Sequence, residues 1–190
     1  MRLILASASP RRAELLASAG FDFDVLPADV DESAHPGEDP ARYVLRVATA
    51  KADLIARRSP SNNSSVILAA DTVVVAGGRM MGKPINDEDA ESMLRQLSGA
   101  VHEVLTAVVL VDKGRISSEV VTTRVHFVPL SDTDIRWYIA TREPEGKAGA
   151  YAIQGRAARF IDWIEGSWSN VVGLPVATVY ALLKQLGDVD

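Results

Sequence analysis

Polar and basic side chains follow directly on a short apolar run near the N-terminus. After residues 3–6, the chain continues Ser7-Ala8-Ser9-Pro10-Arg11-Arg12. A serine before a proline is a strong helix start, so we predict a strand, a tight turn and a helix over 10–19. The helix N-terminus favours phosphate, and the hydroxyl groups of Ser7 and Ser9 and the two guanidinium groups add further donors.

This segment also has a simpler explanation. Ser9 could only cap the helix, while Arg11 and Arg12 face solvent. However, two cations in a first helical turn oppose the helix dipole, so they have no rationale in stability. We therefore take the segment as a candidate phosphate-binding site.

A single carboxylate follows the most continuous apolar run of the chain. Residues 66–70 predict a buried strand, and Asp71 comes next. Ligands of α/β sheets bind beyond the carboxyl ends of strands. A carboxylate there can bind a divalent metal ion or accept a proton from water, but it can also simply form a turn or a cap.

Three further segments carry weaker signals. Lys83 lies between a glycine and a proline that could aim it, although a loop lysine is usually just solvated. Asp31 and Glu32 could supply a metal ligand or belong to an ordinary polar turn. Gln154 lies in a Gly- and Ala-rich stretch over 146–155, and its amide group could read a base edge.

The elements that must position these residues alternate between helices and strands. Turn signals at 77–78 and 113–114 predict hairpins, so the sheet should be mixed rather than purely parallel. We expect strands over 3–6, 21–26, 66–70 continuing through 73–76, 102–111, 116–128 and 159–164. We expect helices over 10–19, from 40 past 51, 87–97, 131–141 and 176–186. The expected loops lie over 59–64, 143–155 and 166–175.

Composition sets further bounds. The 190 residues are 47% hydrophobic, enough for a sizeable core, and we expect a single domain over 1–190. The absence of cysteine excludes disulfides and thiolate chemistry, and a net charge of −5 argues against nonspecific nucleic-acid binding. No apolar stretch approaches a membrane span or a signal peptide, so we expect a cytoplasmic protein without a membrane partner.

Taken in order, these motifs resemble the Maf family of nucleoside triphosphate pyrophosphatases over nearly the full length. Each motif is short, but the ordered set is specific. One departure is Gly146, where related chains often have Asp. The matching segments are 5–12, 31–32, 51–52, 70–72, 82–84, 97–99, 147–151, 153–155 and 170–175.

The resemblance implies an elongated α/β fold, with a mixed central sheet flanked by helices and a substrate cleft between two lobes. It also implies that Asp71 is the catalytic proton acceptor. Glu32 and Asp71 would hold a divalent metal ion, Mg²⁺ or Mn²⁺. The other positions that match the family's substrate and metal sites are Ser9, Arg11, Arg12, Lys51, Lys83 and Gln154, of which Arg12, Lys51 and Lys83 are expected to act in catalysis.

Three positions separate subgroups of this family. Members with Arg, Thr and Gln where this chain has Arg11, Thr72 and Gln154 look like dTTP and UTP hydrolases, whereas Trp, Gln and Glu mark enzymes for 7-methyl-GTP. The resemblance therefore implies hydrolysis of dTTP, UTP and modified pyrimidine nucleotides to monophosphate and pyrophosphate, a house-cleaning activity. It is also compatible with a homodimer.

Two alternatives stay open at this stage. One is a pyrophosphatase for modified purine nucleotides. The other is a nucleotide-binding regulator of cell division without essential turnover, because the family is named after a septum phenotype.

Overall fold

The computed structural model describes residues 2–58 and 65–187, so the predicted loop over 59–64 lies outside the described residues. The strands are β1 Arg2–Leu5, β2 Phe23–Val25, β3 Ser65–Ala76, β4 Arg79–Met81, β5 Val101–Asp112, β6 Arg115–Phe127 and β7 Ile161–Glu165. The helices are α1 Pro10–Ser18, α2 Pro40–Arg58, α3 Asp87–Leu97, α4 Asp132–Ala140, α5 Trp168–Val172 and α6 Val176–Gln185, with the 3₁₀ helices η1 Ala148–Ala150 and η2 Arg156–Phe160.

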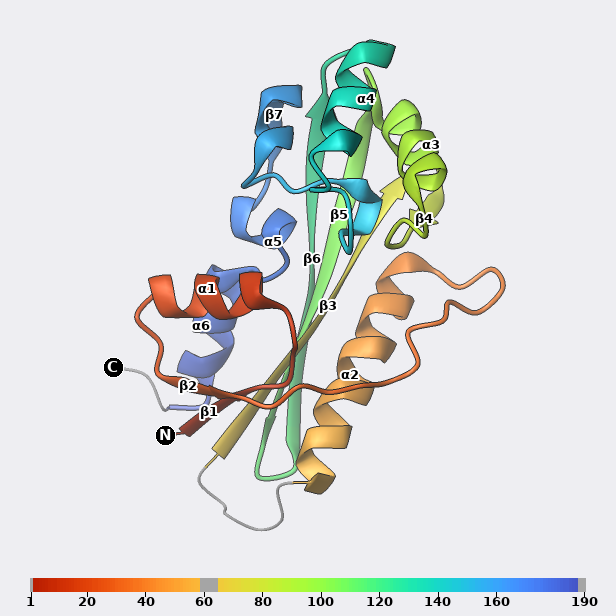
Figure 1. The fold of residues 1–190 in the computed structure, drawn as a ribbon. Coiled ribbons are helices and arrows are strands. Elements are labelled where there is room, and N and C mark those ends of the chain that lie inside the picture. The colour runs from red at the N-terminus through yellow and green to blue at the C-terminus, as the bar shows by residue number, and fades with distance from the viewer. Residues whose placement is uncertain (1, 59–64, 188–190) are drawn as a thin grey trace. The chain divides into compact units, whose positions relative to one another are not determined.

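These strands form one seven-stranded sheet in the order β2-β1-β3-β5-β6-β7, with β4 paired to β3 (Figure 1). β1 is parallel to both β2 and β3, while β4 is antiparallel to β3 and β7 is antiparallel to β6. The predicted mixed α/β sheet is therefore confirmed. The turn between β5 and β6 has positive φ at both Lys113 (48°) and Gly114 (81°), as a tight hairpin turn requires.

Two predicted elements were wrong in part. The expected loop over 166–175 contains the short helix α5, and the expected strand over 159–164 begins only after η2. Both errors have one physical reason. α5 and η2 each have only five residues. A segment this short has too few residues to show a helical period, so its apolar pattern cannot distinguish a helix from a loop or a strand.

The chain divides into two compact units. The first unit comprises Met1–Asp71, Thr106–Val121 and Gly173–Asp190, and the second comprises Thr72–Leu105 and Thr122–Val172. The single domain and the substrate cleft expected from the sequence stay predictions.

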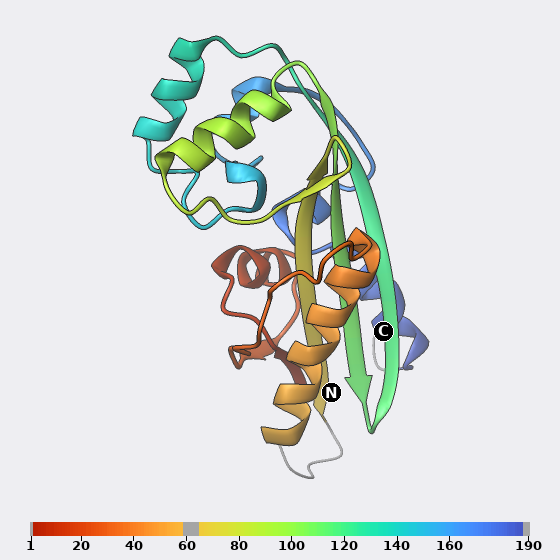
Figure 2. The ribbon, with the colours of Figure 1, turned by 90° about the vertical axis from the view of Figure 1, so that its right-hand side faces the viewer.

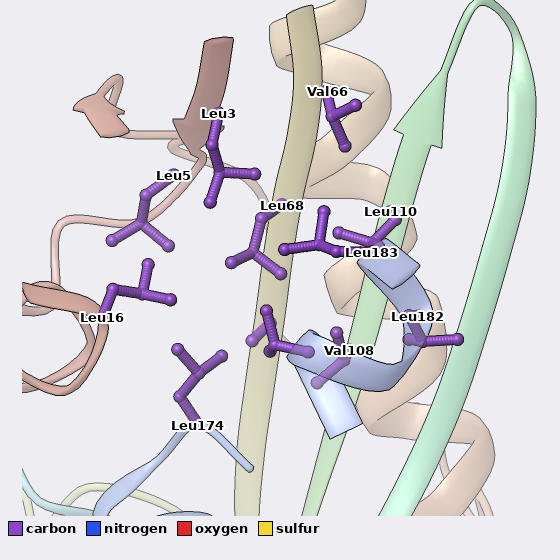
Figure 3. Packing of buried hydrophobic residues seen from close by; sticks show 12 residues of the cluster. Leu3, Leu5, Leu16, Val66, Leu68, Val108, Leu110, Leu174, Leu182 and Leu183 are labelled. Atoms are coloured by element: carbon purple, nitrogen blue, oxygen red, sulfur yellow. The ribbon is translucent and has the colours of Figure 1, made fainter. Parts of the chain in front are cut away.

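The core of the first unit lies between the sheet and two helices. Leucine and valine side chains from β1, β3 and β5 pack against α1 and α6 (Figure 3). The helix α2 covers the opposite face of these strands (Figures 1 and 2). The largest members of this cluster are Leu3, Leu5, Leu16, Leu68, Leu110, Leu174, Leu182 and Leu183.

The second unit has an aromatic core. In both ribbon views α3 and α4 lie side by side (Figures 1 and 2). The ring of Phe127 meets those of Tyr151 and Phe160 at centroid distances of 4.9 and 6.3 Å, and Tyr138 packs edge-on against Phe160.

Among the residues that the structure describes, no helix is both long and apolar enough to span a membrane.

Candidate functional site

The alternation of side chains along β3 directs Asp71 toward α2. The even-numbered residues of 66–70 belong to the cluster on the α6 side, so the odd-numbered positions up to Asp71 face α2. Lys51 lies on the buried side of α2, at helical spacing from Val47 and Ala48. Two ordinary periodicities thus bring a lysine and an aspartate together.

Lys51 bridges two carboxylates in the first unit. Its Nζ lies 2.7 Å from Oδ1 of Asp71 and 2.6 Å from Oε1 of Glu32. The side chains of Lys51 and Asp71 are only 7% and 8% exposed, whereas that of Glu32 is 39% exposed. Because buried charges are tolerated only when they are paired, this contact allows the aspartate to remain ionised inside the protein.

Opposing effects act on the pKa of Asp71. Burial is the largest and raises the pKa above its ordinary value. The charge and hydrogen bond of Lys51 lower it, as does the charge of Arg12, and the charge of Glu32 raises it again. The net direction is upward. A carboxylate with a perturbed pKa and specific charged partners is a functional-site candidate.

Arg12 is buried and joins three chain segments by hydrogen bonds. Its Nε donates to the carbonyl oxygen of Gly173 at 2.7 Å. The Nη1 group donates to Ser7 Oγ at 3.1 Å and to the carbonyl oxygen of Ala70 at 2.8 Å, directly before Asp71. The alternative in which Arg12 faces solvent is therefore excluded. Burial lowers the pKa of Arg12, and the nearby charge of Asp71 raises it in part.

The turn before α1 differs in detail from the prediction. Ser9 does occupy the N-cap position, but its side chain makes no capping hydrogen bond to the described first turn. Its backbone N–H instead donates to Ser7 Oγ at 3.2 Å, so Ser7 organises the turn. Arg11 is partly buried, and this burial lowers its pKa. The predicted phosphate-binding role of this turn stays a prediction.

The two predicted metal ligands have suitable chemistry. Oxygen atoms of Glu32 and Asp71 already converge on one cation, the Lys51 ammonium group. Mg²⁺ is usually held by one or two carboxylates together with water and phosphate oxygens. Within residues 2–58 and 65–187 there is no group of three or more His, Cys, Asp or Glu side chains that could hold a metal. The carboxylates of Glu32 and Asp71 therefore fit a Mg²⁺ site with two protein ligands.

The remaining predicted site residues fall in the second unit. Thr72 follows Asp71 in β3 and is half-buried, while Lys83 and Gln154 are exposed. The loops that carry Lys83 and Gln154 are joined by a hydrogen bond of 3.0 Å from the N–H of Gly149 to the carbonyl oxygen of Gly82. The structure therefore links these two loops within the second unit.

Gly149 and Gly146 both have backbone conformations that favour glycine. A Cβ atom at Gly149 would lie 2.9 Å from Cγ2 of Val74, and its φ is 68°. At Gly146 φ is 66°, and a Cβ atom would meet nothing within 4 Å. Glycine adopts this left-handed conformation freely, and aspartate and asparagine adopt it more readily than other residues do. The exchange of the family's Asp for Gly146 therefore requires little change in the backbone.

Sequence reasoning missed the residues that fix the Glu32 loop. The Tyr43 hydroxyl donates to the carbonyl oxygen of Glu32 at 2.9 Å. Arg46 donates to the carbonyl oxygen of Ser33 at 2.9 Å and to the Glu38 carboxylate at 2.7 and 2.8 Å. The available signal was charge: an acidic stretch precedes a helix that carries an arginine in its second turn. α2 therefore holds Glu32 by its backbone as well as by its side chain.

Fold and site together define an α/β protein with a network of buried charges formed by Arg12, Lys51 and Asp71. Asp71 lies inside the long strand β3 and not at its carboxyl end as expected, whereas Ser7 does follow the carboxyl end of β1, where such folds bind ligands. The chain belongs to the Maf family: the family profile described as Maf-like protein matches residues 2–186.

Individual relatives agree with this assignment. The chain is 51% identical over 190 residues to a protein of Geotalea uraniireducens (strain Rf4), covering 99% of this chain and 96% of that relative. It is 52% identical to a protein of Anaeromyxobacter dehalogenans (strain 2CP-1), with 98% and 94% covered. Both relatives are named dTTP/UTP pyrophosphatase.

A solved structure shares the fold. The Staphylococcus aureus Ham1 protein superposes with a TM-score of 0.53, covering 97% of this chain and 99% of that one. Sequence identity is only 12%, so this likeness concerns the fold alone.

Proposed function

We propose that this protein hydrolyses dTTP and UTP to the nucleoside monophosphate and pyrophosphate. The observation that carries the proposal is the Lys51 ammonium group held between Asp71 and Glu32, at 2.7 and 2.6 Å. Relatives about half identical over nearly the whole chain and named for this activity support it. So does the combination of Arg11, Thr72 and Gln154 in the sequence.

Asp71 is the proposed proton acceptor. Its carboxylate takes a proton from the attacking water as the water oxygen bonds to the α-phosphorus. The bond between the α-phosphorus and the bridging oxygen breaks, and the electron pair leaves with pyrophosphate. Lys51 holds the carboxylate in place and, by lowering its pKa, keeps it deprotonated and able to accept the proton.

Cations supply the electrostatic part of the proposal. Negative charge grows on the leaving pyrophosphate, and fixed cations stabilise it most effectively in a site that excludes water. We assign this role to Lys51 and Arg12 of the first unit, with Ser7, Ser9 and Arg11 as substrate-binding groups. On the family resemblance, Lys83 is a further catalytic cation, and Thr72 and Gln154 recognise the pyrimidine.

The proposal includes a divalent metal ion, Mg²⁺ or Mn²⁺. Glu32 and Asp71 are the residues that would hold it. Such an ion, when bound, lowers the pKa of bound water and neutralises phosphate charge.

Product analysis tests the reaction. With dTTP or UTP and Mg²⁺ or Mn²⁺, chromatography should show the monophosphate and pyrophosphate in equal amounts. Formation of the diphosphate and inorganic phosphate would contradict the proposal. Faster turnover of modified purine nucleotides in the same panel would favour the purine alternative, and nucleotide binding without turnover would favour the regulator.

Base recognition needs its own variant. Gln154→Glu exchanges an amide donor for a carboxylate, so it should lower kcat/KM for dTTP and UTP relative to other nucleotides. An unchanged preference would remove Gln154 from base recognition.

Location and assembly also belong to the proposal. A substrate drawn from the cellular nucleotide pool supports a cytoplasmic location. The family resemblance supports a homodimer. Light scattering of the purified protein would distinguish the dimer from a monomer.

A further inference from the structure

One tyrosine–glutamate pair fastens a loop of the second unit at two points. The Tyr138 hydroxyl donates to Oε1 of Glu143 at 2.8 Å and accepts the backbone N–H of Ala152 at 3.2 Å. The same carboxylate accepts the backbone N–H of Arg156 at 3.0 Å and of Ala157 at 3.4 Å. All these bonds lie within one unit.

Gln154 lies midway between the two fastened points. It follows Ala152 by two residues and precedes Arg156 by two, and its side chain is exposed. The N–H of Gly155 donates to the carbonyl oxygen of Ala152 at 3.0 Å, which closes a turn around the glutamine. The pair therefore holds the backbone on both sides of Gln154 through the N–H groups of Ala152, Arg156 and Ala157.

Gly155 shows how closely the carboxylate approaches the loop. A Cβ atom at this position would lie 2.5 Å from Cδ of Glu143. Real Cβ atoms do not occur at such distances, so any side chain here would displace the carboxylate. The glycine thus admits Glu143 beneath the backbone.

Both members of the pair are themselves held in place. Tyr138 is fully buried, and burial together with its bond to Glu143 raises its pKa, so its hydroxyl remains a donor. The end of α4 orients Glu143: the Thr141 hydroxyl donates to the carbonyl oxygen of Tyr138 at 2.6 Å and accepts the N–H of Glu143 at 3.2 Å. Hydrogen bonds to a carboxylate are stronger than neutral ones, so this arrangement is stiff.

We propose that Tyr138 and Glu143 are positioning residues for nucleobase selection. By fixing the backbone on either side of Gln154, they present its amide group in one orientation. This inference rests on the proposed function, in which Gln154 recognises the pyrimidine. A purely structural pair would support the stability of the second unit but would not affect the choice of base.

Tyr138→Phe and Glu143→Gln test the proposal, because each removes hydrogen bonds with little change in volume. Selectivity is measured as the kcat/KM for dTTP divided by that for dGTP, and thermal unfolding is followed in parallel. Each variant should lower the selectivity roughly threefold to tenfold, the effect of weakening one well-placed polar contact. Glu165→Gln is the matched control: this exposed carboxylate of the same unit pairs with Arg124, and its loss should leave selectivity unchanged.

A double-mutant cycle separates positioning from general damage. If the pair acts through Gln154, Tyr138→Phe and Glu143→Gln should have no further effect on selectivity in a Gln154→Ala background. Gly155→Ala provides a third variant, which displaces the carboxylate without removing it, and should also lower selectivity.

Several results would overturn the inference. One is an unchanged selectivity in Tyr138→Phe and Glu143→Gln proteins that fold. Another is a loss of selectivity from these substitutions that is equally large in the Gln154→Ala background. An unchanged selectivity in Gln154→Ala itself would leave nothing for the pair to position. If the wild-type protein released no pyrophosphate from dTTP or UTP, the proposed function itself would fail. If the wild type released pyrophosphate and Tyr138→Phe kept the wild-type selectivity, only the inference would fail.

Discussion

The ammonium nitrogen of Lys51 lies 2.7 Å from a carboxylate oxygen of Asp71, and both side chains are almost fully buried. α2 contributes the lysine and β3 the aspartate, so the contact joins a helix to the sheet that it covers. A buried ion pair is not in itself a source of stability. The pair does allow the carboxylate to stay ionised where water is excluded. A proton acceptor requires this ionised form.

Removing Lys51 should destabilise the protein. Lys51→Met keeps much of the side-chain volume but leaves Asp71 as a buried carboxylate without its ammonium partner. We expect the free energy of unfolding in urea to fall by roughly 3 kcal/mol, the typical effect of breaking a buried pair from one side. The double variant Lys51→Met/Asp71→Asn should recover much of this loss. Equal stability of the single and double variants would show that the pair is not coupled.

The activity should decline in acid because of Asp71. A proton acceptor works only in its deprotonated form, and the pKa of this carboxylate is raised above its ordinary value. kcat/KM should therefore fall as the pH drops through that raised pKa, earlier than for an exposed aspartate. Because Lys51 lowers the pKa, the residual activity of Lys51→Met should show its acid limb at higher pH. An acid limb at the same pH in both proteins would contradict this assignment.

His102 should make stability depend on pH. The imidazole is buried, contacts the Tyr151 hydroxyl at 2.7 Å, and its Nδ1 has no hydrogen-bond partner among the described residues. Burial, with a smaller contribution from His126, lowers the pKa of His102 from 6.5 to about 4. The unfolded chain therefore binds the proton more tightly between these two values, so stability is full above pH 6.5 and falls as the pH is lowered toward 4.

The expected loss from His102 is roughly 3 kcal/mol at pH 4, since one pKa unit corresponds to about 1.4 kcal/mol. Urea unfolding at pH 7 and pH 4 measures it. His102→Gln, which cannot take up the proton, should show a flatter pH dependence than the wild type. Parallel pH profiles for the two proteins would mean that other groups dominate.

Gly146 and Gly149, two of the three glycines of the 146–155 stretch, should respond differently to alanine. Both have positive φ, so each substitution strains the backbone by about 1 kcal/mol. Only Gly149→Ala adds a close contact with Val74. Its melting temperature should therefore fall well below that of Gly146→Ala, the matched control. Equal melting temperatures would show that Val74 can move aside.

Local patterns in the sequence were sufficient to predict most of the fold. The serine and proline at the start of α1 and the turn residues at 113–114 are short-range signals, and the structure contains both the helix and the hairpin between β5 and β6. The short helix α5 could not be predicted, because it has no periodicity to detect. Pairing of strands such as β1 with β3 depends on contacts between residues more than 60 positions apart.

The site could be predicted only in part for the same reason. The apolar run over 66–70 predicted that Asp71 ends a buried strand, whereas the structure places it inside the longer strand β3. Its contact with Lys51 could not be predicted, because that required knowing that α2 covers β3. The backbone bonds made by Arg12, Tyr43 and Glu143 connect positions that no local pattern links. Such bonds leave no signature in a single sequence, since the partner is a main-chain atom that every residue has.

Pyrophosphate release from dTTP and UTP by the wild-type protein and by Asp71→Asn tests the central claim most directly. The substitution keeps the size of the side chain and removes its ability to accept a proton. With saturating substrate and Mg²⁺, the wild type should release pyrophosphate, and kcat of the variant should be lower by roughly 10²-fold or more, with unfolding monitored in parallel. Near-normal turnover in the variant would contradict the account, because Asp71 would then not be the proton acceptor.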